Sequence, residues 1–200
     1  MCNHYRNLPG AIDDWAVWAG YKPRLPGEPV QEELWPKRAG HVVRRDGGEL
    51  IVDVMQWGVP RTMKGKSGKP IETRVTNVRN LTSPFWKSML ASPDRRCLVP
   101  FTEFAEPKPG KDPVTGRPAE YWFSRVDRAA GAFAGIWRPS EHGNVYAFLT
   151  CEPNALVGAV HPKAMPVILH DEDYARWLDA GYDEACALAA PYPSQLMARA

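Results

Sequence analysis

The sequence has few cysteines, and none of them is spaced for a metal site or a redox motif. Four cysteines occur in 200 residues, at positions 2, 97, 151 and 186, and no two form a C-x-x-C pair. No pair of the five histidines has zinc spacing either. The sequence therefore predicts no metal and no cofactor, and the three later cysteines are expected to be small buried hydrophobic residues.

Long hydrophobic runs are absent too. The longest, such as residues 132–137 and 146–151, are far too short to span a bilayer. The N-terminus has neither the basic segment nor the apolar stretch of a signal peptide. We therefore expect no membrane partner and a cytoplasmic location, associated with the nucleoid if the host is bacterial.

A strong charge imbalance is also missing. The net charge is only +2, weaker than that of a protein that coats nucleic acid, although a local basic groove is compatible with it. With 44% hydrophobic and 24% charged residues, the composition is typical of a soluble globular protein. No internal repeat or domain-sized linker interrupts the chain, so we expect one domain over residues 1–200.

Short β-type runs dominate the pattern. Residues 41–58 read as a hairpin around Asp46-Gly47-Gly48, because glycines supply the positive φ of a tight turn. Further runs separated by Pro/Gly loops or a polar turn indicate a sheet curled into a barrel or a sandwich. These runs are residues 74–80, 95–106, 119–126, 131–139, 144–150 and 165–170.

Helices and loops fill the remainder. Residues 22–40 read as a long surface connection, and the lysine- and glycine-rich residues 61–74 as a mobile polar loop. Helices are predicted over residues 11–21, over 83–92 with Ser83 as N-cap and Pro84 at the first position, over 154–161, and once or twice over 171–190. The predicted fold is α+β, a single domain on a curled, mainly antiparallel sheet.

The second residue is a cysteine, directly behind the initiator methionine. If Met1 is trimmed, which is plausible before a side chain this small, Cys2 carries a free α-amine beside its thiol. Internal cysteines cannot offer such a 1,2-aminothiol. A chance placement of Cys2 is the alternative.

Three further polar residues stand at unusual places. Asn77 lies in a β-type stretch, where an amide either makes a turn or positions a group by hydrogen bonds. Glu106 ends an aromatic-rich run; facing inward beside Phe104 it would have a raised pKa that suits acid-base chemistry, whereas at an edge it would be solvated. His161 lies between an expected helix and strand, a usual place for functional side chains, although lone histidines are often structural.

These residues carry a resemblance to a known family. The chain resembles the SRAP (SOS response-associated peptidase) family, a domain that attaches itself covalently to abasic sites in single-stranded DNA. The matching segments occur in the family's order along almost the whole chain. They are Met1-Cys2, "WGVP" (57–60), "TNVRN" (76–80), "RCLVPFTEFAE" (96–106) and "HPKAMPVIL" (161–169).

The chain departs from the family pattern at several positions. Asn3 and His4 stand where the family usually has Gly-Arg, so a phosphate contact of that arginine would need Arg6 instead. Leu81 replaces a frequent Glu behind the Asn-x-Arg segment. Glu103 and Pro107 replace the Gly and Trp of the family's loop around the catalytic Glu.

The resemblance implies a function and a set of site residues. Cys2 would form a Schiff base and then a thiazolidine with the opened sugar; Asn77 would orient the reactants, Glu106 would shuttle protons, and His161 would donate to the sugar oxygen. The partner would be single-stranded DNA containing abasic sites, bound by a monomer with no cofactor. The DNA contacts would come from Arg79 and, in part, from Arg6, Lys64, Lys66 and Lys87, with Trp57 either a stacking wedge or a core residue.

Two other functions fit parts of the same pattern. The first is a cysteine or N-terminal-nucleophile peptidase, with Cys2 as nucleophile and His161 as base. The second is a noncatalytic reader of single-stranded or modified DNA, in which Cys2 is incidental.

Overall fold

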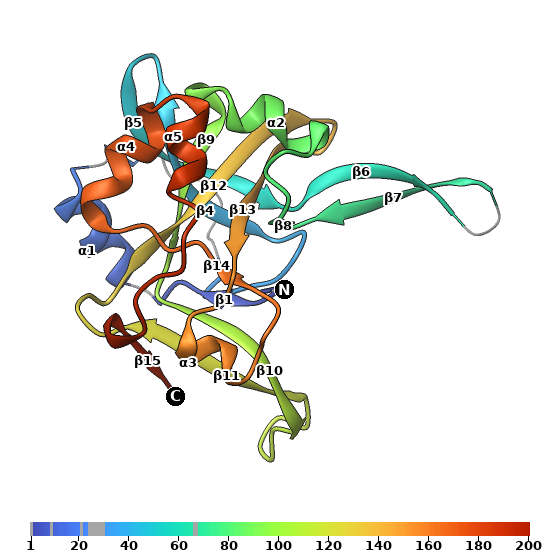
Figure 1. The fold of residues 1–200 in the computed structure, drawn as a ribbon, viewed down its shortest axis with the longest axis vertical. Helices are drawn as coiled ribbons and strands as arrows, with labels where there is room; N and C mark the ends of the chain where they lie inside the picture. The colour runs from blue at the N-terminus through green and yellow to red at the C-terminus, as the bar shows by residue number, and fades with distance from the viewer. Residues whose placement is uncertain (1, 9, 21, 24–30, 66–67) are drawn as a thin grey trace.

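A closed ring of five strands forms the centre of the molecule (Figure 1). The computed structural model describes residues 2–8, 10–20, 22–23, 31–65 and 68–200. Strands β5, β4, β9, β12 and β13 pair in that order, and β13 returns to β5 through a parallel pairing of Val145 with Gln56 and of Tyr146 with Trp57. The bounds are β4 (Ala39–Asp46), β5 (Glu49–Trp57), β9 (Arg96–Phe101), β12 (Gly131–Ser140) and β13 (Gly143–Cys151).

Short strands extend this sheet, and a second sheet packs beside it. The additions to the first sheet are β2 (Lys22–Pro23), β8 (Asn77–Val78) and β14 (Met165–Pro166). The second sheet has the order β15-β11-β10-β1-β3. Its strands are β1 (Tyr5–Arg6), β3 (Glu33–Leu34), β10 (Glu103–Lys111), β11 (Pro118–Arg125) and β15 (Met197–Arg199). The α+β fold with a curled, mainly antiparallel sheet is thus confirmed.

The helices are short and lie outside the sheets. Helix α2 begins at Pro84 as predicted, although the Ser83 side chain makes no capping hydrogen bond. The predicted helical region 171–190 contains two α-helices. The bounds are α1 (Ala11–Trp18), α2 (Pro84–Leu90), α3 (Ala155–Gly158), α4 (Tyr174–Asp179) and α5 (Tyr182–Ala187). In the part of the chain that the structure describes, no helix has the length and apolar character needed to cross a membrane.

The hairpin predicted over residues 41–58 is confirmed. Strands β4 and β5 pair without a break from Ala39 opposite Gln56 to Asp46 opposite Glu49. Gly47 and Gly48 form the two-residue turn with φ values of 57° and 90°. Positive φ at both central positions is the conformation that matches the right-handed twist of the strands, and glycine adopts it without steric cost.

The prediction of a loop over residues 61–74 is wrong. This segment forms a two-stranded hairpin, β6 (Val59–Lys64) and β7 (Pro70–Val75), which projects from the body as an arm (Figure 1). Thr62 and Ile71 are good strand formers, but Met63 and Ile71 are as exposed as the charged residues beside them, so the alternation of a half-buried strand is missing. Backbone pairing needs no such alternation.

Glycine at position 40 leaves room for a contact between two tyrosines. The hydroxyl groups of Tyr5 and Tyr146 hydrogen-bond to each other inside the core. A Cβ on Gly40 would lie 2.3 Å from the hydroxyl oxygen of Tyr146 and 2.8 Å from that of Tyr5. The close approach of β4 to these side chains therefore requires glycine.

We expect Gly40→Ala to lower the free energy of unfolding by on the order of 2 kcal/mol, because an added methyl group in a packed core forces its neighbours apart. Gly181→Ala is the control, since a Cβ there meets nothing within 4 Å. Chemical denaturation of both variants measures the difference. Equal stability of the two would contradict the steric role of Gly40.

Candidate active site

Cys2 lies at the edge of the core, just before β1. Its side chain is buried, and its Sγ donates to the backbone oxygen of His4 at 3.4 Å. The same oxygen accepts the N–H of Ala105 at 2.9 Å, so strand β10 fixes the chain directly behind the cysteine. Cys2 is thereby held against the strand that carries Glu106.

Asn77 is a strand residue, not a turn residue. It belongs to β8, which pairs in parallel with β13, and its side chain is buried. Its Nδ2 donates to the backbone oxygen of Cys2 at 2.9 Å and to Oγ1 of Thr76 at 2.8 Å. The Thr76 hydroxyl in turn donates to Oδ1 of Asn3 at 3.2 Å. Asn77 of β8 and Thr76, the residue before this strand, therefore hold the N-terminal segment in place.

Glu106 is fully buried on β10, opposite Tyr121 of β11. Neither of its carboxyl oxygens makes a hydrogen bond with the described residues. The Nδ1 of His161 lies 3.3 Å from Oε2, but its hydrogen bond goes to the backbone oxygen of Ala164 at 2.9 Å. Burial, with a smaller effect from the charge of Glu120, raises the pKa of Glu106 to about 7. Of the two orientations that the sequence left open, the structure has the inward-facing one and not the solvated edge position.

His161 follows α3 and is only slightly exposed. Asn154 caps that helix by accepting the N–H of Val157 at 2.9 Å, and the N–H of His161 bonds to the oxygen of Val157 at 2.8 Å. Because Ala164 accepts through a carbonyl, Nδ1 carries the proton and Nε2 the lone pair. Burial lowers the pKa of His161, so the imidazole is neutral at pH 7.

The thiol of Cys2 is protonated in this environment. Burial raises its pKa far above the ordinary value, and the nearby charge of Glu106 raises it further. A nucleophilic thiolate would therefore have to form at the moment of reaction, with a base beside it. Glu106, with a pKa near neutrality, can give or take a proton there.

The structure thus brings together the four predicted catalytic residues, Cys2, Asn77, Glu106 and His161, from four separate segments of the chain. Sequence reasoning missed Thr76 and Glu120, which position or influence members of this group. Thr76 is a polar residue next to Asn77 in a β-type run, and that adjacency is the signal that could have found it.

The residues predicted to bind DNA differ in their exposure and in the groups that they already contact. Arg79 is exposed and hydrogen-bonds to Glu152, whereas Lys87 lies 5.8 Å from the centre of the Tyr182 ring. Arg6 is bonded to Glu33 and Glu103, which already balance its charge. Lys64 is exposed at the end of β6, and Lys66 lies outside the described residues.

Trp57 is not a stacking wedge. Its side chain has no exposed surface and stacks on Phe148 with ring centres 5.2 Å apart. The indole Nε1 donates to the backbone oxygen of Thr76 at 3.2 Å. Trp57 is therefore a core residue that supports Thr76 from behind, which corrects the wedge interpretation.

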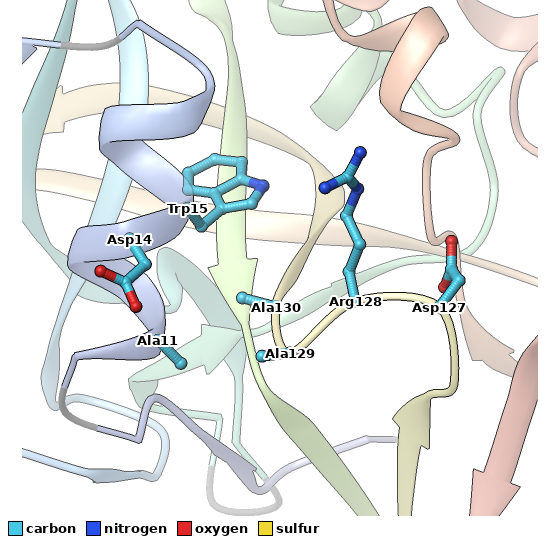
Figure 2. A pocket seen from close by; sticks show the side chains of 7 residues that line it. All are labelled: Ala11, Asp14, Trp15, Asp127, Arg128, Ala129 and Ala130. Atoms are coloured by element: carbon cyan, nitrogen blue, oxygen red, sulfur yellow. The ribbon is translucent and has the colours of Figure 1, made fainter.

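A cavity of about 270 Å³ lies apart from this group, between α1 and the loop that follows β11. Figure 2 shows Trp15 and Arg128 on opposite sides of it. Two of its charged groups are engaged in ion pairs, Arg128 with Asp171 at 2.5 Å and Asp127 with Arg125 at 2.6 Å. None of the predicted site residues lines this cavity, so it is not the candidate active site.

Among the described residues, one group has the geometry for a metal ion. Its members are Glu72, Glu141 and His142, whose ligand atoms lie within 4.8 Å of one another. All three are exposed, and Arg74 and His142 already lie 3.3 Å from Glu72. Exposed acidic groups of this kind are common without an ion, so the group indicates no metal centre.

Comparisons with known proteins identify relatives of the chain. The family model described as SOS response associated peptidase (SRAP) matches residues 15–200 and thus begins after Cys2. A crystal structure from Bordetella bronchiseptica is 24% identical with a TM-score of 0.76 and covers 100% of this chain and 98% of its own. One from Bacteroides thetaiotaomicron is 18% identical with a TM-score of 0.72, covering 99% and 90%.

A phage-related protein from Bordetella bronchiseptica is a third structural relative. It is 21% identical with a TM-score of 0.65, and the coverage is 100% of this chain and 92% of that protein. No curated protein matches the chain. The three structures support the fold over its whole length.

The pKa of Glu106 predicts how stability depends on pH. The folded state holds its proton up to about pH 7, whereas the unfolded chain releases it near the ordinary glutamate pKa of 4.5. The folded state therefore binds more protons between these values, and its stability falls as pH rises through this window. We expect Glu106→Gln to be more stable than the unaltered protein at pH 8, by on the order of 2–3 kcal/mol, and equal to it near pH 4.

Denaturant unfolding at both pH values measures this difference. Glu141→Gln, at an exposed position, serves as the control and should follow the unaltered protein throughout. A Glu106→Gln variant whose stability fell with pH as steeply as that of the unaltered protein would show that Glu106 does not titrate in this window.

Proposed function

Because the chain belongs to the SOS response associated peptidase (SRAP) family, we propose that it captures abasic sites in single-stranded DNA covalently through Cys2. The family description by itself associates the chain with the SOS response and with a peptidase. The observation that carries the finer proposal is the placement of a fully buried carboxyl group, Glu106, beside a buried thiol and a neutral imidazole.

The reaction begins with the α-amine of Cys2, which becomes available once Met1 is removed. Met1 itself lies outside the described residues. An abasic site exists in part as a ring-opened aldehyde, and an α-amine with a pKa of about 7.7–8.0 is appreciably neutral at cellular pH. The nitrogen lone pair attacks the aldehyde carbon, and the carbonyl oxygen takes a proton from Glu106. The nitrogen then gives one of its protons to the Glu106 carboxylate, which leaves a neutral carbinolamine and a protonated Glu106.

Dehydration and ring closure follow. Glu106 donates its proton to the carbinolamine hydroxyl group, water leaves, and a protonated Schiff base forms. The thiol then adds to the same carbon: its sulfur forms the new bond, its proton passes to the Glu106 carboxylate, and the electron pair of the C=N π bond returns to the nitrogen. The product is a five-membered thiazolidine, and one water is released overall. The raised pKa of the thiol makes a neighbouring base necessary for this step.

Asn77 and His161 serve the substrate in different ways. Asn77 holds the backbone oxygen of Cys2 and so fixes the direction of the nucleophile. His161 is neutral with its lone pair on Nε2, so it accepts the proton of the anomeric hydroxyl as the sugar ring opens, and the imidazolium then gives this proton to the ring oxygen that leaves. The resemblance implied only the donation to the sugar oxygen, and the tautomer and lowered pKa add the preceding acceptance.

The phosphate contacts come from basic residues that are exposed or partly exposed. Arg79 follows the strand that carries Asn77, and its present partner, Glu152, is exposed and easily exchanged for a phosphate. Lys64 on the arm and Lys87 on α2 add positive charge, and Arg6 contributes where Glu33 releases it. Phosphate contacts of this kind recognise single-stranded DNA without reading its base sequence.

A cysteine peptidase needs a different electrostatic environment. Peptidase cysteines are activated by a lowered pKa or by an adjacent histidine base. Here burial and Glu106 raise the pKa of Cys2, and the Nδ1 proton of His161 is directed to Ala164. This environment favours an aminothiol that reacts with an aldehyde over a thiolate that cleaves peptides.

We expect the purified protein to lack Met1 and to form a heat-stable adduct with an abasic oligonucleotide, both read by intact mass. Cys2→Ser should abolish the heat-stable adduct, because the hydroxyl group cannot close the thiazolidine. Cys186→Ser, at a partly exposed cysteine outside the site, is the matched control. Loss of Met1 without an adduct would favour the peptidase, and neither change would favour the noncatalytic reader.

The two proton carriers should be separable by substrate. We expect Glu106→Gln to slow adduct formation and reversal by about 10²–10⁴-fold, since the amide cannot accept a proton. His161→Ala should slow the reaction with abasic DNA but have less effect on a small aldehyde that has no ring to open. Rates by gel shift and mass spectrometry give the comparison. Equal slowing on both aldehydes would assign His161 an orienting role instead.

A further inference from the structure

A second cavity, of about 350 Å³, lies beside the proposed crosslinking centre. It lies against the sheet β11-β10-β1-β3, and its lining includes residues on or next to β1, β3 and β11, namely His4, Arg6, Glu33, Trp35, Glu120 and Trp122, among others. His4 connects the two sites, because its backbone oxygen accepts a hydrogen bond from the Cys2 thiol while its ring lines the cavity. A ligand in this cavity would therefore lie next to the group that reacts with the sugar.

The walls of the cavity are flat. The ring of His4 stacks on Trp35 with centres 3.7 Å apart and an angle of 21°, and meets the edge of Trp122 at 4.6 Å. The guanidinium carbon of Arg6 lies 3.6 Å from the centre of the Trp122 ring. Trp35 is still 39% exposed. Indole and guanidinium planes are surfaces on which unpaired bases stack.

Two hydrogen-bond acceptors stand side by side in the cavity. Nδ1 of His4 donates to Oε2 of Glu120 at 2.8 Å, and in the neutral ring this tautomer has its lone pair on Nε2. The His4 side chain is only 4% exposed, and Nε2 has no hydrogen-bond partner among the described residues. Oε2 of Glu33 lies 3.7 Å away, too far for a direct hydrogen bond. Oε1 of Glu33 accepts from Arg6 at 2.8 Å.

The charge of the cavity disfavours a phosphate. Carboxylates at Glu33, Asp112 and Glu120 line it, against arginines at positions 6 and 117. Arg6 is further balanced by Glu103. The lining suits a flat, uncharged ligand that carries N–H donors.

We propose that this cavity receives the base of the nucleotide next to the abasic sugar and prefers bases with an exocyclic amino group. The base stacks on Trp35, and its amino group donates to Oε2 of Glu33 and Nε2 of His4. Guanine, adenine and cytosine have such a group. Thymine has none, and its carbonyl oxygens would face the carboxylate. The assignment rests on the proposed function for the placement of the sugar.

The test measures noncovalent binding with an oligothymidine that contains one tetrahydrofuran residue, an abasic analogue without an aldehyde. Guanine replaces thymine next to the analogue, on either side in turn. We expect guanine on one side to tighten binding about five- to tenfold over thymine. Glu33→Gln should reduce this ratio to about one, because the amide presents a donor as well as an acceptor. Glu141→Gln, outside the cavity, should retain the ratio.

Equal binding of guanine and thymine on both sides would overturn the proposal, as would a folded Glu33→Gln variant that keeps the preference. Thermal unfolding verifies folding, and Trp35→Ala provides a second variant, which should lose more affinity for the guanine strand than for the thymine strand. Adduct formation with aldehyde-bearing DNA is measured separately. An adduct without base preference refutes only the base site, and a base preference without an adduct supports the base site while refuting the crosslinking chemistry.

Discussion

The insertion of β1 between β3 and β10 is the constraint on which the candidate site depends. Tyr5 pairs with Leu34 on one side and with Phe104 on the other. A strand of two residues has few hydrogen bonds of its own, so the side chain must contribute most of the stability. The Tyr5 ring is fully buried against Trp57 and Phe133, a burial that contributes on the order of 2–3 kcal/mol. The position of Cys2, three residues earlier, follows from this anchor.

The main free-energy cost of the site is the burial of Glu106. A carboxyl group without hydrogen bonds in a buried place is unfavourable when ionised, and the protein accommodates it by raising its pKa. A core built only for stability would have an apolar side chain there. Buried ionisable groups without structural partners are a recurrent mark of functional sites. Cys2 and His161 share the same low-dielectric surroundings, which keep both of them uncharged at neutral pH.

Much of the fold follows from local sequence signals. The Asp46-Gly47-Gly48 turn and the Ser83-Pro84 helix start determine their elements through backbone conformation alone. The arm was missed because its pairing leaves no hydrophobic alternation in the sequence. The burial of Trp57 could not be predicted from local sequence either, since it depends on the parallel pairing of β13 with β5 across almost ninety residues of sequence.

The site was partly predictable for a similar reason. Cys2, Asn77, Glu106 and His161 are each unusual for their local context, and the family resemblance supplied their order. The roles of Thr76 and Glu120 required three-dimensional contacts. His4 looked only like a departure from a pattern, because its stacking on Trp35 and its bond to Glu120 join segments far apart in the chain.

The pairing of β1 with β10 also sets an order of events during synthesis. The first strand cannot dock until residues 103 and 104 have left the ribosome, and His161 comes later still. At about 5–20 residues per second, the N-terminal segment waits for several seconds before its place in the sheet exists. Processing enzymes need an accessible terminus, so the proposed removal of Met1 would fall in that interval, before the finished fold buries Cys2. The topology would thus separate this proposed processing in time from the proposed reaction.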